Sequence, residues 1–270
     1  KTYFQCSLKE AHGMHSKFIR TSRDRAFRMF MKPILREINI SFAKTQKGTS
    51  DYLGGNEDNL RWIAKKEYLS KNLKEIISQI DTYMEKGEII KDEEGHKIIR
   101  LKLNEEIFVI KKYQIKGSWH YLRKLFSQTR ALTAWKASHW FNAAGIKTFN
   151  IVAVIEKYNF LTTTESYLIS LNQLEERLDL VDLNKQPEYL IENRLSSFFK
   201  RLEWIGFNHG DAKNANFFFG NNNLIVSDLD VSKRRHLNYI LKFKLSKDKK
   251  RILKSFEDNL KIKNSLLRRL

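Results

Sequence analysis

The sequence has few of the residues that would place this protein outside the cytoplasm or within a membrane. Cysteine occurs once among 270 residues, at Cys6, which excludes a disulfide within the chain and suits a reducing compartment. No apolar run approaches the ~20 residues that span a bilayer, and the start of the chain lacks the apolar core of a secretory signal. The sequence therefore predicts a cytoplasmic location.

Acidic residues are also scarce, most of all at the two ends. The chain has 31 Asp and Glu against 50 Lys and Arg, a net charge of +19, and residues 233–270 alone carry fourteen basic against three acidic residues. Such ends either form a solvated basic surface or bind an anionic partner. We expect anionic lipid on the inner face of the cytoplasmic membrane, where each basic residue contributes ~1 kcal/mol. Nucleic acid is the weaker candidate, because no zinc spacing or RNA-binding signature is present.

The most informative motif runs from residue 208 to 216 and reads Asn-His-Gly-Asp-Ala-Lys-Asn-Ala-Asn. Its Asp, the Lys two residues on and the Asn five residues on have the spacing of a kinase catalytic loop, and twelve residues later a short apolar run ends at another Asp. Phosphoryl transfer from ATP needs a carboxylate near the acceptor hydroxyl, a cation near the departing charge and oxygen ligands for Mg²⁺. We therefore predict Asp211 as base, Lys213 as charge stabiliser, and Asn216 and Asp228 as metal ligands.

The surrounding pattern suits such a loop. Apolar residues at helical spacing from Tyr189 to Trp204 predict a helix that leads into it. Residues 217–219 and 224–226 predict the strands of a hairpin, because the Gly and three Asn between them tolerate the positive φ of a tight turn. The hairpin would bring Asp211 and Asp228 together. The alternative is a polar loop between a helix and a hairpin, without chemistry.

A kinase also needs a cation on an upstream strand, and residues 107–111 read as an apolar strand that ends in lysine. We favour Lys111 as the phosphate ligand. Lys112 competes, because neighbours on a strand point to opposite faces, and both could instead be solvated surface lysines. Ile169 and Asn172, at the end of a later strand, are assigned as further nucleotide contacts.

The rest of this region predicts an antiparallel sheet with one long helix. Strands are expected at 87–90, 98–103, 151–155 and 166–169, and a helix from Arg130 to Ala144. In kinases that helix carries a glutamate that pairs with the strand lysine, yet no acidic residue occurs between Lys111 and Val154. Either the lysine finds another partner or this region is organised differently.

Taken together, these motifs resemble the lipopolysaccharide core kinases, which phosphorylate 3-deoxy-manno-octulosonic acid (Kdo) or heptose on lipid A–core. The resemblance implies a bilobal protein-kinase-like fold that uses ATP and magnesium to phosphorylate a sugar hydroxyl. Many such relatives have Glu where Ala134 stands, and Asp230 replaces the glycine of protein kinases and could contact metal. The resemblance runs from about residue 86 to 256, through residues 109–113, 116–119, 129–135, 144–148, 153–156, 209–216, 228–230 and 247–253.

The predicted fold class is therefore α+β. We expect a helical N-terminal extension over residues 1–85, with helices at 21–42 and 59–86 and a linker at 46–56. Residues 86–172 would form a small antiparallel-sheet lobe with one long helix. Residues 173–270 would form a reduced, mainly helical lobe that ends in a basic tail.

The expected function is ATP-dependent phosphorylation of an inner-core sugar, Kdo or heptose, with lipid A–core as acceptor. Only about forty residues come after Asp228, too few for the activation segment and large helical lobe of a protein kinase, which favours a small or carbohydrate acceptor. One alternative is a phosphotransferase for a protein or an aminoglycoside-type small molecule. Another is a non-catalytic, membrane-bound relative, favoured by Ala134 and by a first hairpin poor in glycine.

Overall fold

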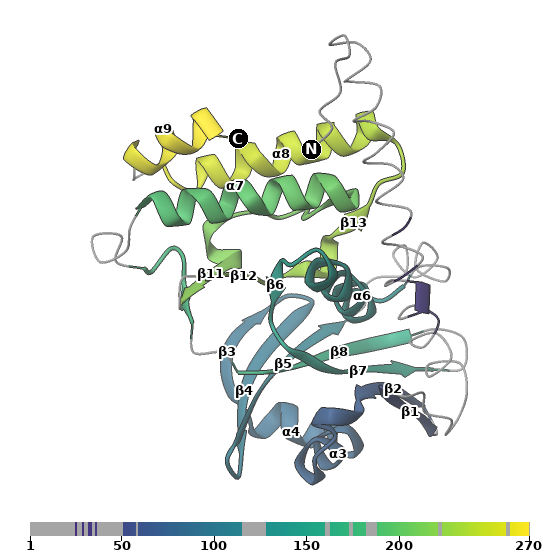
Figure 1. The fold of residues 1–270 in the computed structure, drawn as a ribbon. Helices are drawn as coiled ribbons and strands as arrows, with labels where there is room; N and C mark the ends of the chain where they lie inside the picture. The colour runs from purple at the N-terminus through teal and green to yellow at the C-terminus, as the bar shows by residue number, and fades with distance from the viewer. Residues whose placement is uncertain are drawn as a thin grey trace.

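The computed structural model describes most of the chain after residue 50. It covers residues 51–57, 59–114, 128–159, 163–172, 175–181, 188–220, 223–257 and 260–269, with five single residues between 25 and 36. An antiparallel sheet lies at one end of the molecule, a group of helices at the other, and helix α6 between them (Figure 1). Most of the helix predicted at 21–42, and the whole of the 116–119 motif, lie outside the described residues.

The large sheet has seven strands in the order β1-β2-β7-β8-β5-β4-β3, and every neighbouring pair is antiparallel. The five strands predicted between residues 87 and 169 are all present, each within a few residues of its expected ends. The bounds are β1 Tyr52–Glu57, β2 Leu60–Lys65, β3 Glu88–Glu93, β4 His96–Leu103, β5 Glu106–Gln114, β7 Ile151–Tyr158 and β8 Thr163–Leu171.

The prediction of a linker and then a helix was wrong for residues 52–65. Residues 60–65, expected to begin a helix, form strand β2, which pairs with β7 and buries Ile63 and Ala64 completely. Gly55, expected in a linker, lies in β1 directly under the indole of Trp62, where a Cβ atom would come within 3 Å of the ring. The glycine thus marks a close approach between strands rather than a flexible connection.

Helices occupy only the last part of that segment. After the short turn η2 (Lys66–Tyr68), helix α3 (Lys71–Ser78) begins where the Ser70 side chain accepts a hydrogen bond from Leu73 N, and α4 (Ile80–Lys86) follows. Because β1 and β2 pair into the same sheet as β3 to β8, the sheet runs across the boundary predicted between residues 85 and 86.

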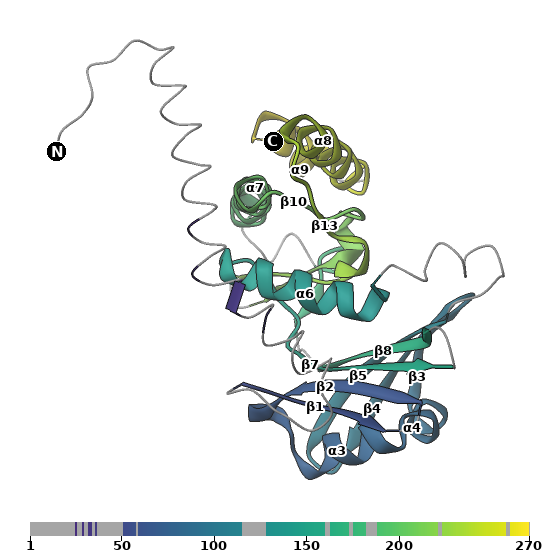
Figure 2. The ribbon, with the colours of Figure 1, turned by 90° about the vertical axis from the view of Figure 1, so that its right-hand side faces the viewer.

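The two faces of the sheet carry different helices. On β5, Phe108 and Ile110 face α3 and α4 and share a buried cluster with them. Tyr113 points to the opposite face, where helix α6 (Arg130–Ala143) packs Trp135 against the sheet. Figure 2 shows α6 on one side of the sheet and α3 and α4 on the other. Any side chain that follows the direction of Tyr113 therefore points toward α6 and the segments beyond it.

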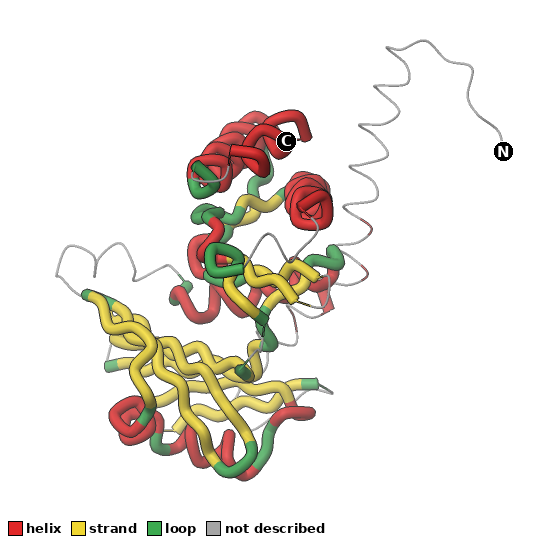
Figure 3. Tube along the Cα trace, turned by 90° about the vertical axis from the view of Figure 1, so that its left-hand side faces the viewer, coloured by secondary structure: helices red, strands yellow, loops and turns green. Residues whose placement is uncertain are grey.

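Beyond α6 lie three helices, α7 (Glu188–Ile205), α8 (Asn238–Lys254) and α9 (Leu260–Arg269). They share a second core, rich in phenylalanine, with the predicted hairpin of β11 (Phe217–Gly220) and β12 (Asn223–Val226). Short strands β6 (Lys147–Thr148) and β9 (Glu176–Arg177) flank the hairpin, and β10 (Phe207–Asn208) pairs with β13 (Lys233–Arg234). Figure 3 shows this second group set apart from the large sheet. No helix among the described residues has the length and hydropathy to cross a bilayer.

Candidate active site

The loop that contains Asp211 connects α7 to the β11–β12 hairpin, as the sequence predicts. Gly206 ends α7 with φ +76, and Gly210 turns the chain again with φ +91. A Cβ atom at Gly210 would lie 2.9 Å from the carbonyl oxygen of Val231, so both the backbone angle and the available space call for glycine there. The 3-10 turn η3 (Asn214–Asn216) then leads into β11.

His209 is completely buried and connects the two halves of the motif. Its Nδ1 accepts a hydrogen bond from Asp211 N at 3.2 Å, and its Nε2 lies 3.0 Å from Ser227 O. A ring that accepts at Nδ1 and donates at Nε2 is neutral, and burial indeed lowers the pKa of His209 below its ordinary value. His209 thus connects the Asp211 loop to the segment that ends at Asp228.

Asn216 and Asp211 are in direct contact. The Nδ2 of Asn216 donates to the carbonyl oxygen of Asp211 at 2.7 Å and to its carboxylate Oδ2 at 3.0 Å. Both amide protons are therefore engaged, which leaves Oδ1 as the atom that could coordinate a metal. The Nζ of Lys213 lies 3.4 Å from Asp211 Oδ2 and its side chain is about half exposed, so Lys213 can move toward a ligand.

Lys111 reaches this loop from the large sheet. Its Nζ forms an ion pair with Asp228 Oδ1 and lies 3.9 Å from Asp230 Oδ2 in η4 (Leu229–Val231). Lys112 points to the other face of the sheet, where its Nζ is 2.6 Å from Glu165 Oε1. Of these two neighbouring lysines, Lys111 is therefore the one that faces the loop.

Asp228 has the properties expected of a metal-binding carboxylate. Burial by itself would raise the pKa of Asp228, but the neighbouring Lys111 ammonium outweighs burial and lowers that pKa below its ordinary value. The carboxylate is therefore ionised at neutral pH. Its backbone is left-handed, with φ +58 and ψ +49, a conformation that aspartate adopts more readily than most residues and that is often found at functional sites.

Arg130 lies one helical turn before Ala134, the position at which the resemblance predicts a glutamate. Ala134 is almost fully buried in the core. At the start of the same helix, Arg130 Nη2 is 2.6 Å from Asp230 Oδ2, and its guanidinium lies 4.8 Å above the ring of Tyr113. The helix thus supplies a cation, and Asp228 and Asp230, before and within η4, supply the carboxylates near Lys111. The only local signal for Arg130 in the sequence is a basic residue at the start of a helix without acids.

Asp230 depends on these ion pairs. Its side chain is only 1% exposed, and neither of its oxygens has a hydrogen bond of good geometry within the described part of the chain. A buried carboxylate without cations nearby would be costly, since transfer of a charge from water is strongly unfavourable. The ion pairs with Arg130 and Lys111 therefore offset part of the cost of burying the Asp230 carboxylate.

Asp248 of α8 holds the backbone of the Asp211 loop at residues 209 and 210. Its buried carboxylate accepts hydrogen bonds from His209 N at 2.8 Å and from Gly210 N at 3.0 Å. One turn further along the helix, Arg251 Nη1 donates to Gly210 O at 2.5 Å and lies 3.7 Å from Asp211 Oδ1. Asp248 and Arg251 lie in the 247–253 stretch that carries the family resemblance, but no motif in the sequence indicates a role for either. A further local signal is that Asp248 is a single acid within an otherwise basic helix.

The side chain of Ile169 is not brought to this site. Ile169 is fully buried in the cluster with α3 and α4, on the face of the sheet that points away from Lys111. Lys111 lies opposite Leu168 on β8, and Asn172, four residues beyond Leu168, uses its backbone N–H to bond Ile107 O at 2.9 Å. A side-chain contact from Ile169 to a nucleotide at Lys111 would therefore need the opposite face of the strand.

Comparisons with known proteins point to the same kind of protein as the geometry of this site. Residues 81–267 match the model of the lipopolysaccharide kinase (Kdo/WaaP) family. The chain belongs to this family. All the site residues described above lie within the matched range, whereas β1, β2 and α3 of this lipopolysaccharide kinase precede it.

One solved structure is informative for the fold. The structure described as "WaaP in complex with acyl carrier protein" is similar with a TM-score of 0.52 and 17% identity, over 72% of this chain and 82% of that chain. At this identity, the likeness shows a shared fold. No curated protein matches the chain.

A kinase of this family uses ATP and requires a divalent cation, and the residues present suit Mg²⁺. Asp228 and Asn216 offer oxygen atoms, which this hard cation prefers. Within the described residues, no three of His, Cys, Asp and Glu are grouped as a metal site. Magnesium in phosphoryl-transfer sites usually takes one or two protein ligands together with phosphate oxygens and water, so this sparse set fits the ion.

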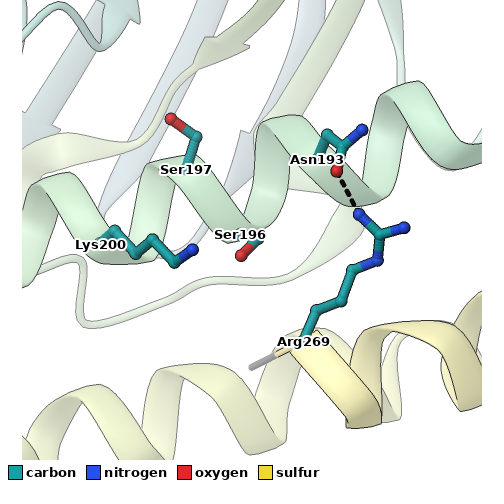
Figure 4. A pocket seen from close by; sticks show the side chains of 5 residues that line it. All are labelled: Asn193, Ser196, Ser197, Lys200 and Arg269. Carbon is teal, nitrogen blue, oxygen red and sulfur yellow. Dashed lines mark hydrogen bonds between the residues drawn. The ribbon is translucent and has the colours of Figure 1, made fainter.

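A separate hollow of about 360 Å³ lies between α7 and α9. It is lined by polar side chains, and in Figure 4 Arg269 reaches across from α9 to hydrogen-bond Asn193 on α7. Its lining residues are Asn193, Ser196, Ser197, Lys200 and Arg269. None of them belongs to the site around Asp211.

Proposed function

We propose that this protein transfers the γ-phosphoryl group of ATP to a hydroxyl of Kdo or heptose in the inner core of lipopolysaccharide, on a bilobal protein-kinase-like fold. The observation that carries the proposal is a pair of direct contacts, Asn216 with Asp211 and Lys111 with Asp228, which His209 connects through its hydrogen bonds to Asp211 N and Ser227 O. The four residues of these two contacts come from three separate segments of the chain. Their types and order match the needs of phosphoryl transfer.

Asp211 would accept the proton of the attacking hydroxyl. The hydrogen bond from Asn216 to Oδ2 orients the carboxylate, and the Arg251 guanidinium lies 3.7 Å from the Oδ1 atom. A positioned carboxylate of this kind contributes 10²–10⁴-fold to the rate of proton transfer, as an order of magnitude. Lys213, 3.4 Å from the same carboxylate, would approach the negative charge of the transferred group.

Lys111 would bind phosphate oxygens, while Asp228 and the Oδ1 of Asn216 would hold magnesium. Bound magnesium neutralises charge on the phosphates during transfer. In the structure described here, Lys111 and Asp228 neutralise each other instead. Nucleotide binding would therefore exchange this ion pair for contacts of each residue with the ligand, which keeps the net charge of the site balanced.

The short connection after Asp228 favours a carbohydrate acceptor. Among the described residues, η4 and β13 lead directly into α8, without room for the long segment that positions a peptide in protein kinases. The basic residues beyond 232 would place the enzyme peripherally on the inner face of the cytoplasmic membrane, beside lipid A–core. The WaaP structure was determined with acyl carrier protein, which makes a protein partner a second proposal for this chain.

The decisive experiment measures transfer of labelled phosphate from ATP to purified lipid A–core that carries either Kdo alone or Kdo with heptose. We expect magnesium-dependent labelling by the wild type and a loss of about 10²–10⁴-fold in Asp211→Asn and Asp211→Ala. Labelling that persists in Asp211→Ala would contradict the proposal. Turnover of an aminoglycoside or a protein, without activity on core sugars, would select the alternative phosphotransferase.

A non-catalytic role is the remaining alternative, favoured by the missing helix glutamate and by a first hairpin poor in glycine. The ion pairs of Asp230 with Arg130 and Lys111 support a different arrangement that could position the lysine. Calorimetry of Mg·ATP binding separates the two possibilities. Absence of any binding would favour the non-catalytic role.

A further inference from the structure

The outer face of α8 combines exposed aromatic rings with lysines. Tyr239 and Phe243, one helical turn apart, are 71% and 56% exposed, and Leu237 just before the helix is 51% exposed. Large apolar side chains exposed together at helical spacing commonly mark an interaction site. We define the α8 outer face by its exposed residues Tyr239, Lys242, Phe243, Ser246, Lys247, Lys250 and Lys254.

The charge of this face has one sign. Its four lysines are exposed, and the Nζ of Lys247 lies 4.6 Å from the centre of the Phe243 ring. The one acidic residue of α8, Asp248, is 2% exposed and lies on the opposite side of the helix. Figures 1 and 2 both place α8, together with α9, at the end of the molecule away from the large sheet.

We propose that the α8 outer face docks on a bilayer that contains anionic phospholipid. The rings of Tyr239 and Phe243 enter the headgroup region, and the surrounding lysines extend their ammonium groups to lipid phosphates. Helices with aromatic residues amid lysines are typical of binding in the membrane interface. Protein–protein interfaces are depleted in lysine at their centre, which makes a protein the less suitable occupant.

The opposite side of the same helix holds the Asp211 loop. Asp248 accepts hydrogen bonds from His209 N and Gly210 N, and Arg251 donates to Gly210 O. One helix diameter, about 10 Å, therefore separates the lipid surface from the loop. If the proposed function is correct, docking fixes Asp211 at a height that a sugar near the membrane surface can reach.

Sedimentation with lipid vesicles tests the docking face without ATP or acceptor. The probes are phosphatidylcholine vesicles with and without 30% phosphatidylglycerol, at about 0.1 M salt, where charge attraction acts over about 10 Å. We expect the wild type to bind the anionic vesicles at least tenfold more tightly than the neutral ones. Tyr239→Ser/Phe243→Ser and Lys242→Gln/Lys247→Gln should each weaken that binding about tenfold or more, given the contribution of each such residue.

Matched controls change the same residue types elsewhere. Ile89→Ser/Ile90→Ser removes two exposed apolar side chains from β3, and Lys71→Gln/Lys74→Gln removes two exposed lysines from α3. Both control variants should bind anionic vesicles like the wild type. Equal vesicle binding by the wild type and both α8 variants overturns the proposal. So does wild-type binding to RNA or to a protein partner, but not to vesicles, that is lost in the α8 variants.

Activity measurements separate this proposal from the proposed function. The α8 variants should phosphorylate a soluble, deacylated core acceptor at the wild-type rate but an acceptor embedded in vesicles several-fold more slowly, because docking concerns only the second. Equal rates with both acceptors would overturn the link between docking and catalysis. If the wild type phosphorylates no core acceptor but its vesicle binding still depends on Tyr239 and Phe243, the proposed function fails while docking stands.

Discussion

Arg130 and Asp230 form an ion pair across the junction between the large sheet and the helical group, with Arg130 Nη2 2.6 Å from Asp230 Oδ2. Lys111 lies on the other side of the same carboxylate oxygen at 3.9 Å. One buried carboxylate therefore connects the start of α6 with the lysine of β5. In kinases a helix glutamate contacts the lysine directly, whereas here the contact passes through a residue of η4.

Arg130→Gln should weaken both stability and nucleotide binding. It leaves Asp230 with one cation, and because the Arg130 side chain is 42% exposed we expect a cost of about 1–2 kcal/mol in the free energy of unfolding, less than for a fully buried pair. The KM for ATP should rise more than the KM for the acceptor, because Lys111 loses its support. Urea unfolding and steady-state kinetics measure these effects. The double variant Arg130→Gln/Asp230→Asn should regain part of the stability, and strictly additive losses would contradict the coupling.

Lys111→Ala and Lys112→Ala form a matched pair on neighbouring positions of β5. We expect Lys111→Ala to lower kcat/KM for ATP by about 10²-fold or more, since a charge-assisted contact to phosphate is lost. Lys112→Ala removes the ion pair with Glu165 and the contact with the Tyr167 ring, both on the opposite face, and should stay within about twofold of wild type. Equal losses in the two variants would show that Lys111 has no special contact with the nucleotide.

Gly210→Ala tests the geometry of the Asp211 loop, with Gly95→Ala as control. Both glycines have positive φ, +91 and +86, so alanine at either costs about 1–2 kcal/mol in backbone strain. At Gly95 nothing lies within 4 Å of the new Cβ atom, whereas at Gly210 it meets Val231 O at 2.9 Å. We expect Gly95→Ala to keep wild-type kcat and Gly210→Ala to lose at least tenfold. Equal kcat values would mean that the loop accommodates the change.

Buried histidines should make the protein less stable as the pH falls below 6.5. Burial lowers the pKa of His139 to about 3, with Lys65 contributing, so the folded state keeps this ring neutral while the unfolded state binds a proton below pH 6.5. The unfolded state then binds more protons, and the free energy of unfolding falls by up to about 1.4 kcal/mol per pH unit for this residue.

Urea unfolding between pH 7.5 and 5 measures this slope, above the range in which most carboxylates titrate. His139→Gln keeps an acceptor for the Trp135 indole N–H. It should reduce the pH dependence of the free energy of unfolding by the contribution of this one histidine. The pKa values of His96 and His209 are also lowered by burial, so these two histidines should account for the pH dependence that remains in the variant. An unchanged slope in His139→Gln would show that this residue is accessible to protons in the folded state.

Local patterns were sufficient for most elements around the site. The alternating strand 98–103, the apolar strand that ends at Lys111, and the Gly-Asn turn of the β11–β12 hairpin all lie where the sequence predicts them. Residues 60–65 were misread, because their strand is defined by pairing with β7, almost ninety residues later, rather than by their own periodicity. Such long-range pairing overrides local propensity.

The candidate site residues also divide into those that a local motif brings together and those that only the fold brings together. Asp211, Asn216 and Asp228 lie within one short motif, so their proximity could be predicted. Arg130 could not be, because its partner Asp230 is one hundred residues away and only the fold shows that α6 begins beside η4. The face toward which Ile169 points also depended on the strand register, which the sequence leaves open.

Helix α6 contributes to two separate cores. Ala134, Ala137, Trp140 and Phe141 pack with the helical group, whereas Ala131, Leu132 and Trp135 pack with the sheet that carries Lys111. Asp211, Asn216 and Asp228 are held to one another by hydrogen bonds within the helical group. A small rotation of the sheet about the axis of α6 would therefore move Lys111 relative to Asp228 but would leave Asp211, Asn216 and Asp228 in place relative to one another. The distance across the nucleotide site would then depend on the angle between the sheet and the helical group.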